Sequence, residues 1–348
     1  MAFARLAPLI FIAAMIGLAF AGSKVRTYPV DPASFCSFEF TQLDEPASDI
    51  LVFGTSRAGR GIDAAYVQTL LRAKTGGDVS VQRLSLANPD IPSFDVFYRE
   101  YLRQRGAPKL VVLQVLYNRE PERQALIGAP LHNVRNVLLG DLGDLHAVQK
   151  EAEAETSGER LRRGYRPITA VAIDKFTNNI YAALRYPYFS SLGMDPNTIC
   201  VDDLPLRQSG NWLHGDLPGE PTVEDPRDHG SPEDWAAEVA GYLPLDPAGV
   251  DRALEVGQMR RLIQLIRSNG SEVALVLFPI FGETISQGDL ASIRSLYPDL
   301  DVIDLDTPFH SAVEANEAAH FVDANHVNAK GALVLSTELA SQLEGRLP

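Results

Sequence analysis

A serine placed directly after a predicted strand is the first residue of this sequence that could carry chemistry. Gly54-Thr55-Ser56-Arg57 follows the short apolar run Asp49–Phe53, which is typical of a buried strand that stops at Gly54. Ligands of doubly wound sheets bind beyond the carboxyl ends of the strands, so Ser56 would be accessible to a substrate. Gly54 would let the chain turn sharply there, and N–H groups of that turn could stabilise an oxyanion. On its own this common pattern also fits a structural turn.

A candidate base lies near the other end of the chain. The sequence FVDANHVNAKG at 321–331 precedes a predicted final helix, and it places Asp323 three residues before His326. One tight turn can bring these side chains together, so that the carboxylate holds the imidazole in one tautomer and leaves the other ring nitrogen free as a base. Taken alone, the spacing also fits a helix cap beside a surface histidine. With Ser56, the pair predicts nucleophilic acyl-transfer chemistry.

Apolar periodicity predicts alternating strands and helices on both sides of a long central segment. Before that segment, strands are predicted at 49–53, 79–86 and 109–117, and helices at 63–73 (with Asp63 as N-cap) and 93–105. After it, helices are predicted at 253–268, 289–296 and 330–343, and strands at 272–279 and 301–305. This rhythm predicts an α/β fold with a parallel sheet covered on both faces.

The central segment, 119–246, breaks the strand–helix rhythm. It has helical patterns but no convincing buried strand, and it is predicted to be a helical and loop insertion that could form a cap. A short helix near its end would have Ser231 as its cap and Pro232 at its first position. Four aromatic residues could line a sugar or acyl site or could belong to a core: Tyr181, Tyr186, Tyr188 and Phe189.

The first 23 residues predict export from the cytoplasm. Arg5 is followed by an uncharged apolar run over 6–23, which suits a signal peptide cleaved near Ala19-Phe20-Ala21 or a short membrane anchor. Either interpretation places the remaining chain in the periplasm with 24–48 as a linker, and an anchor would hold it at the inner membrane. In that oxidising compartment, Cys36 and Cys200 could form one disulfide or remain buried free thiols.

Composition excludes some function classes. The 348 residues include 45% hydrophobic and 22% charged residues, enough for a sizeable core. The net charge of -14 and the lack of a basic stripe argue against nucleic-acid binding. The remaining histidines have no zinc-ligand spacing, and neither a metal site nor a cofactor is predicted. These histidines are His132, His146, His214, His229, His310 and His320.

Together, the two chemical motifs resemble the SGNH (GDSL-like) hydrolase superfamily. The resembling segments are DILVFGTSRAGRGID at 49–63 and FVDANHVNAKGA at 321–332, the latter similar to the D-x-x-H-x-N-x-x-G form of envelope-associated members. The resemblance implies a three-layer α/β/α, flavodoxin-like domain in two parts, 49–118 and 247–348. It also implies Ser56 as nucleophile, with Asp323 and His326 as its partners.

The resemblance is weaker for the oxyanion donors. Besides the Ser56 N–H, which is expected to donate, the family usually supplies them from a glycine after strand two and an asparagine after strand three. Asn118 matches the last of these, although it could equally be an ordinary turn residue. No glycine follows strand two, where Ala87 or Asn88 would have to donate because Pro89 has no N–H.

The expected function is that of an exported serine esterase or O-acyltransferase. Exported relatives in this superfamily often modify cell-envelope polysaccharides, so an acylated saccharide or another ester is the expected substrate. A membrane-bound acyl-donor protein is the expected partner if the acyl group is transferred. The alternative is a non-catalytic SGNH-like module that binds carbohydrate or assists assembly in the envelope, which the missing glycine after strand two would support.

Overall fold

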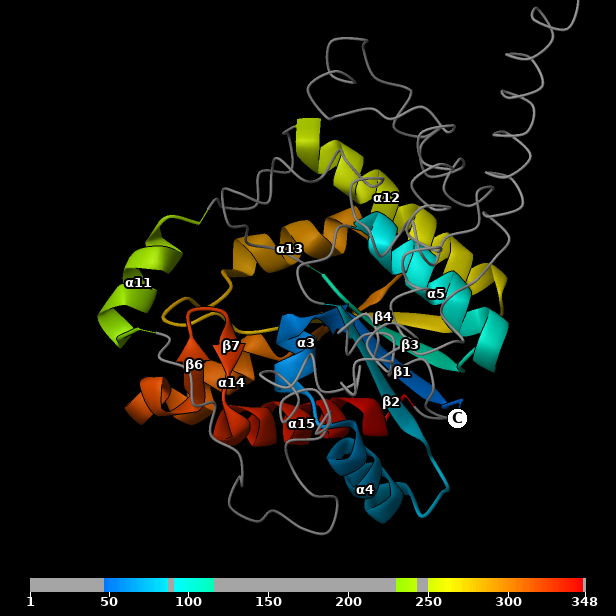
Figure 1. The fold of residues 1–348 in the computed structure, drawn as a ribbon, viewed down its shortest axis with the longest axis horizontal. Helices are drawn as coiled ribbons and strands as arrows, with labels where there is room; N and C mark the ends of the chain where they lie inside the picture. Colours follow the sequence, from blue (N-terminus) through cyan, green and yellow to red (C-terminus); the bar gives the residue numbers. More distant parts are fainter. Residues whose placement is uncertain (1–46, 87–90, 116–229, 243–249, 347–348) are drawn as a thin grey trace, which may run out of the picture. The chain divides into compact units, whose positions relative to one another are not determined.

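The computed structural model describes residues 47–86, 91–115, 230–242 and 250–346 (Figure 1). Several predicted features lie outside these ranges: the N-terminal segment, nearly all of the linker, most of the insertion with its aromatic cluster, and both cysteines. Among the described helices, none has the length and apolar character needed to cross a membrane.

A parallel sheet of five strands forms the centre of the described structure. The strands are β1 (Ile50–Thr55), β2 (Val81–Leu86), β3 (Leu110–Gln114), β4 (Glu272–Leu277) and β5 (Asp301–Asp304). Their order is β2-β1-β3-β4-β5, and every pairing is parallel. The predicted α/β class with a parallel sheet is therefore confirmed. From β1 the chain moves to β2 on one side of it. The later strands β3, β4 and β5 follow one another on the other side, so the winding direction changes between β1 and β3.

The helices alternate with the strands much as the sequence predicts. They are α3 (Ser56–Gly61), α4 (Ala64–Thr75), α5 (Ile91–Arg105), α11 (Pro232–Ala240), α12 (Val250–Ser268), α13 (Gln287–Leu296), α14 (Asp306–Val313), the 3-10 helix η6 (Glu314–His320) and α15 (Ala329–Glu344). The sequence did not predict α3, α14, η6 or the short hairpin β6 (Phe321–Asp323) and β7 (His326–Val327). These elements have too few residues for a detectable period, and two of the six residues of α3 are glycines, which favour helix weakly.

All described elements except most of α5 belong to one compact unit, and the contacts discussed below lie within it. Helices α4 and α15 pack against each other, and α12 packs on β4. Figure 1 shows α4 and α15 on one side of the sheet and α12 and α13 on the other. Right-handed crossovers that run in opposite directions from the centre of a sheet place their helices on opposite faces, which accounts for α4 on one side and for α12 and α13 on the other.

Gly54 has a different role from the predicted one. β1 continues through Thr55, so Gly54 lies inside the strand and not at a turn. A Cβ atom at Gly54 would lie 2.5 Å from both Ala58 Cβ and Gln114 Oε1. The missing side chain leaves room for Gln114 Oε1, which accepts hydrogen bonds from Thr55 N (2.8 Å) and Thr55 Oγ1 (3.1 Å). Gln114 thereby joins the carboxyl ends of β3 and β1.

The first turn of α15 is packed tightly under the β6–β7 hairpin. Asn328 caps α15 by accepting from the N–H groups of Lys330 and Gly331, and its Nδ2 donates to Ala319 O at 2.8 Å. A Cβ atom at Gly331 would lie 2.4 Å from His320 O and 2.6 Å from Val327 Cβ. Asn328 and Gly331 therefore fix the hairpin to the helix that follows it.

We expect Gly331→Ala to lower the free energy of unfolding by about 1–3 kcal/mol, because the new methyl group must displace backbone in a packed region. Denaturant unfolding of the full chain measures this difference. Gly345→Ala is the matched control at the other end of α15, where φ is -80 and no heavy atom lies within 4 Å of the built Cβ. Equal losses in both variants would show that the close approach at Gly331 is not what matters.

Candidate active site

Ser56 lies where β1 ends and α3 begins. Thr55 caps α3: its Oγ1 accepts a hydrogen bond from the Arg57 N–H at 3.2 Å. Because β1 is buried along its whole length between β2 and β3, its carboxyl end holds Ser56 at a defined position. The Ser56 N–H belongs to the first turn of α3, where N–H groups have no acceptor within the helix itself.

Asp323 and His326 are held by the turn that joins β6 to β7. Asp323 Oδ1 accepts hydrogen bonds from the backbone N–H groups of Asn325 and His326, each at 2.9 Å. The same carboxylate contacts the imidazole, with His326 Nδ1 2.7 Å from Oδ1 and 2.9 Å from Oδ2. The carboxylate therefore orders both the backbone of the turn and the ring of the histidine.

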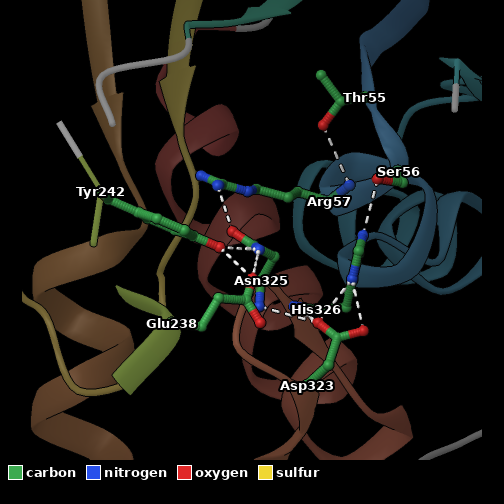
Figure 2. A network of polar contacts seen from close by, with 8 residues as sticks. All are labelled: Thr55, Ser56, Arg57, Glu238, Tyr242, Asp323, Asn325 and His326. Carbon is green, nitrogen blue, oxygen red and sulfur yellow. Dashed lines mark hydrogen bonds and ion pairs between the residues drawn. The ribbon is translucent and has the colours of Figure 1, made fainter. Parts of the chain in front are cut away.

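The structure brings all three predicted residues together. His326 Nε2 lies 2.7 Å from Ser56 Oγ, and Figure 2 shows the ring between the serine and the carboxylate. The contact depends on packing, because α3 lies against both β7 and α15. With Nδ1 donating to Asp323, Nε2 is left as the acceptor for the serine proton. This arrangement can produce a serine nucleophile that is activated by an oriented base.

The surroundings of His326, and burial above all, favour its neutral form. Burial lowers the pKa of the imidazole, the hydrogen bond and charge of Asp323 oppose this, and the positive charges of Arg60 and Arg57 lower it further, so that the net pKa lies below 6.5. For Asp323, burial would raise the pKa, but the hydrogen bond and charge of His326, the Asn325 N–H and Arg60 outweigh it and lower the pKa to about 2. At neutral pH the carboxylate is ionised and the imidazole is a free base.

The site remains open to solvent despite this packing. The side chains of His326 and Asp323 keep 21% and 22% of their accessible surface, and Ser56 is also partly exposed. A small electrophile could therefore reach the serine oxygen from outside.

A second polar cluster adjoins the three residues, and the sequence analysis did not identify it. Arg57 Nη2 donates to Asn325 Oδ1 at 2.5 Å, and Asn325 Nδ2 donates to Glu238 Oε1 at 3.2 Å and to the Tyr242 hydroxyl. Figure 2 shows this cluster beside the serine and histidine. The positions of Arg57 next to Ser56 and of Asn325 next to His326 were the available signals. Nothing near Glu238 or Tyr242 in the sequence pointed to the site.

Two of the predicted oxyanion donors lie outside the described residues. These are Asn88 and Asn118, so the Ser56 N–H is the predicted donor for which the structure gives a position. In the part of the chain that the structure describes, no group of three or more histidine, cysteine or carboxylate side chains is arranged to hold a metal ion.

The electrostatic account predicts opposite shifts in the pKa of His326 for two variants. Arg60→Gln removes a repelling positive charge and should raise the pKa, whereas Asp323→Asn removes an attracting negative charge and should lower it. NMR titration of the imidazole measures both. Arg72→Gln on α4, whose guanidinium pairs with Asp78, is the control and should leave the pKa of His326 unchanged. Shifts of the same sign in the two test variants would contradict this account.

Comparison with known proteins identifies no relative of this chain: no family model and no curated protein sequence matches it.

Proposed function

We propose that this chain is a serine esterase or O-acyltransferase of the SGNH type that works through an acyl-serine intermediate. The observation that carries the proposal is the continuous series of hydrogen bonds from Asp323 through His326 to Ser56, with 2.7 Å between His326 Nε2 and Ser56 Oγ. A nucleophile, a base within hydrogen-bond distance and a group that orients the base are the recurring parts of serine acyl-transfer enzymes.

In the first half of the proposed reaction, His326 Nε2 removes the proton from Ser56 Oγ as the oxygen attacks an ester carbonyl. Asp323 stabilises the imidazolium that forms, and the Ser56 N–H donates to the oxyanion of the tetrahedral intermediate. When the intermediate collapses, the carbon–oxygen bond to the alcohol breaks. The departing alkoxide takes the proton from His326, and the acyl group stays on Ser56.

In the second half, an incoming hydroxyl group loses its proton to His326 and attacks the acyl-serine carbonyl. The bond to Ser56 Oγ then breaks, and the serine recovers its proton from His326. Water as the acceptor makes the chain an esterase, whereas a sugar hydroxyl makes it an O-acyltransferase. The same three residues serve both outcomes, so the acceptor is determined by what else binds beside Ser56.

The sheet supports assignment to the SGNH type. Its order β2-β1-β3-β4-β5 is that of flavodoxin-like doubly wound sheets. Ser56 follows β1, next to the point where the winding direction changes, and ligands bind at such points in doubly wound folds. We therefore propose a three-layer, flavodoxin-like domain with the site at the carboxyl edge of its sheet.

The proposed setting is the periplasm, with a cell-envelope polysaccharide as substrate. It rests on the basic and apolar N-terminal sequence and on the resemblance to envelope-associated SGNH proteins. If the acyl group is transferred to the polysaccharide, a membrane-bound acyl-donor protein would be the partner.

We expect a fluorophosphonate probe to label Ser56 in the purified full chain, kept in mild detergent. Ser56→Ala should abolish labelling, and His326→Ala should slow it by about 10³-fold or more, because the serine then has no base. Ser268→Ala is the control, since the Ser268 hydroxyl is exposed and bonded only to the Leu265 carbonyl among the described contacts. A folded wild type that resists the probe would favour the non-catalytic alternative.

The labelling rate should depend on pH through His326 alone. It should be constant near neutral pH and fall on the acid side with an apparent pKa below 6.5, because only the neutral imidazole can accept the serine proton. Asp323, with a pKa of about 2, stays ionised throughout this range. Rates measured over a series of buffers test this, and an acid limb centred above 6.5 would contradict it.

A further inference from the structure

Asn325 occupies a central position in the turn that carries the base. It lies between Asp323 and His326 in the sequence, and its side chain is almost fully buried. Its Oδ1 accepts from Arg57 Nη2 at 2.5 Å, and Arg57 is the residue after Ser56. One side chain therefore joins the turn that carries the base to the helix that begins with the nucleophile.

The other end of the Asn325 amide reaches α11. Nδ2 donates to Glu238 Oε1 at 3.2 Å and to the Tyr242 hydroxyl, and that hydroxyl donates to Glu238 Oε1 at 2.6 Å. These three groups form a closed set of hydrogen bonds, visible in Figure 2. Glu238 on α11 is exposed, and Tyr242, two residues after α11 ends, is partly exposed, so both reach from the surface toward a buried amide.

A second contact joins α11 to the same turn. Trp235 is buried and packs edge-to-face on Phe281, with ring centroids 5.3 Å apart. The Phe281 N–H donates to Ala324 O at 3.1 Å, and Ala324 is the residue before Asn325. Phe281 also packs on Phe321, at the start of β6, at 5.5 Å. Apolar contacts and hydrogen bonds thus both connect α11 to the Asp323–His326 turn.

We propose that α11, together with Tyr242 just after it, is a positioning element for the base, acting through the hydrogen bonds that Tyr242 and Glu238 make with Asn325. The turn lies between strands of three and two residues, so its own pairing constrains it weakly. Contacts from α11 and Arg57 hold it at the distance from Ser56 that proton transfer requires. The effect of this role on reaction rate rests on the proposed function, but its effect on the geometry of His326 does not.

The first test measures labelling rate and the pKa of His326 in Tyr242→Phe and Asn325→Ala. We expect Asn325→Ala to slow fluorophosphonate labelling by about 10- to 100-fold and Tyr242→Phe by a smaller factor, since small displacements of a base cost large factors in rate. Thermal unfolding shows whether each variant is folded. Tyr242→Phe lies outside the turn and removes one hydroxyl, so it keeps the test valid if Asn325→Ala fails to fold.

The pKa of His326 separates positioning from a merely structural role. Burial is the largest influence on this pKa, and Asp323, Arg57 and Arg60 are the charged groups that act on it. Loosening the turn exposes the ring to water, so the pKa should rise toward 6.5 in both variants. Glu233→Gln is the matched control, because Glu233 is an exposed carboxylate on the same helix.

A double-mutant cycle tests whether Tyr242 acts through Asn325. The rate losses of Tyr242→Phe and Asn325→Ala should be less than multiplicative when combined, whereas Glu233→Gln should not alter the loss from Asn325→Ala. Independent losses would overturn the proposal. So would a labelling rate within twofold of the wild type together with an unchanged pKa of His326 in both single variants. A wild type that resists the probe would contradict the proposed function, and NMR titration would still decide the positioning role.

Discussion

The hydrogen bond between His326 Nε2 and Ser56 Oγ joins residues that are 270 positions apart in the chain. The distance between these two atoms depends on how Ser56 and His326 are each held by their own elements. Ser56 is set by β1, which is buried between β2 and β3 and is joined to β3 through Gln114. The imidazole is set by the hairpin fixed to α15, and α15 packs on α3 and α4. Burial of apolar surface around the sheet thus supplies the energy that holds a polar contact in place.

The electrostatics of the site balance opposing effects on one ring. Burial and two neighbouring arginines lower the pKa of His326, and Asp323 raises it. A carboxylate paired only with a histidine would favour the charged imidazole, which cannot accept a proton. Burial of the ring, the largest effect, and the positive charges of Arg57 and Arg60 on the helix that begins with Ser56 offset that tendency. Asp323 can therefore orient the ring without leaving it protonated at neutral pH.

The fold class was predictable because most of its elements are long enough to show a period. The parallel sheet, five of its flanking helices and the short helix capped by Ser231 all lie close to their predicted positions. Such patterns reflect burial of one face or of a whole strand, and local sequence records that burial directly. Of the elements that were not predicted, α3 and the β6–β7 hairpin are short and lie at the site itself. They are stabilised by their neighbours more than by their own residues.

The sequence by itself determined the three residues of the candidate site, since a serine after a strand and a carboxylate three residues before a histidine are local patterns. Only the tertiary structure decided that these patterns meet. It also decided that Gly54 makes room for Gln114 and forms no turn, and that Glu238 and Tyr242 reach the turn of the base through Asn325. Contacts of this kind depend on which surfaces the sheet and helices bring within a few ångströms of each other. No periodicity along the chain encodes that approach, because the partners come from separate elements whose relative position only packing determines.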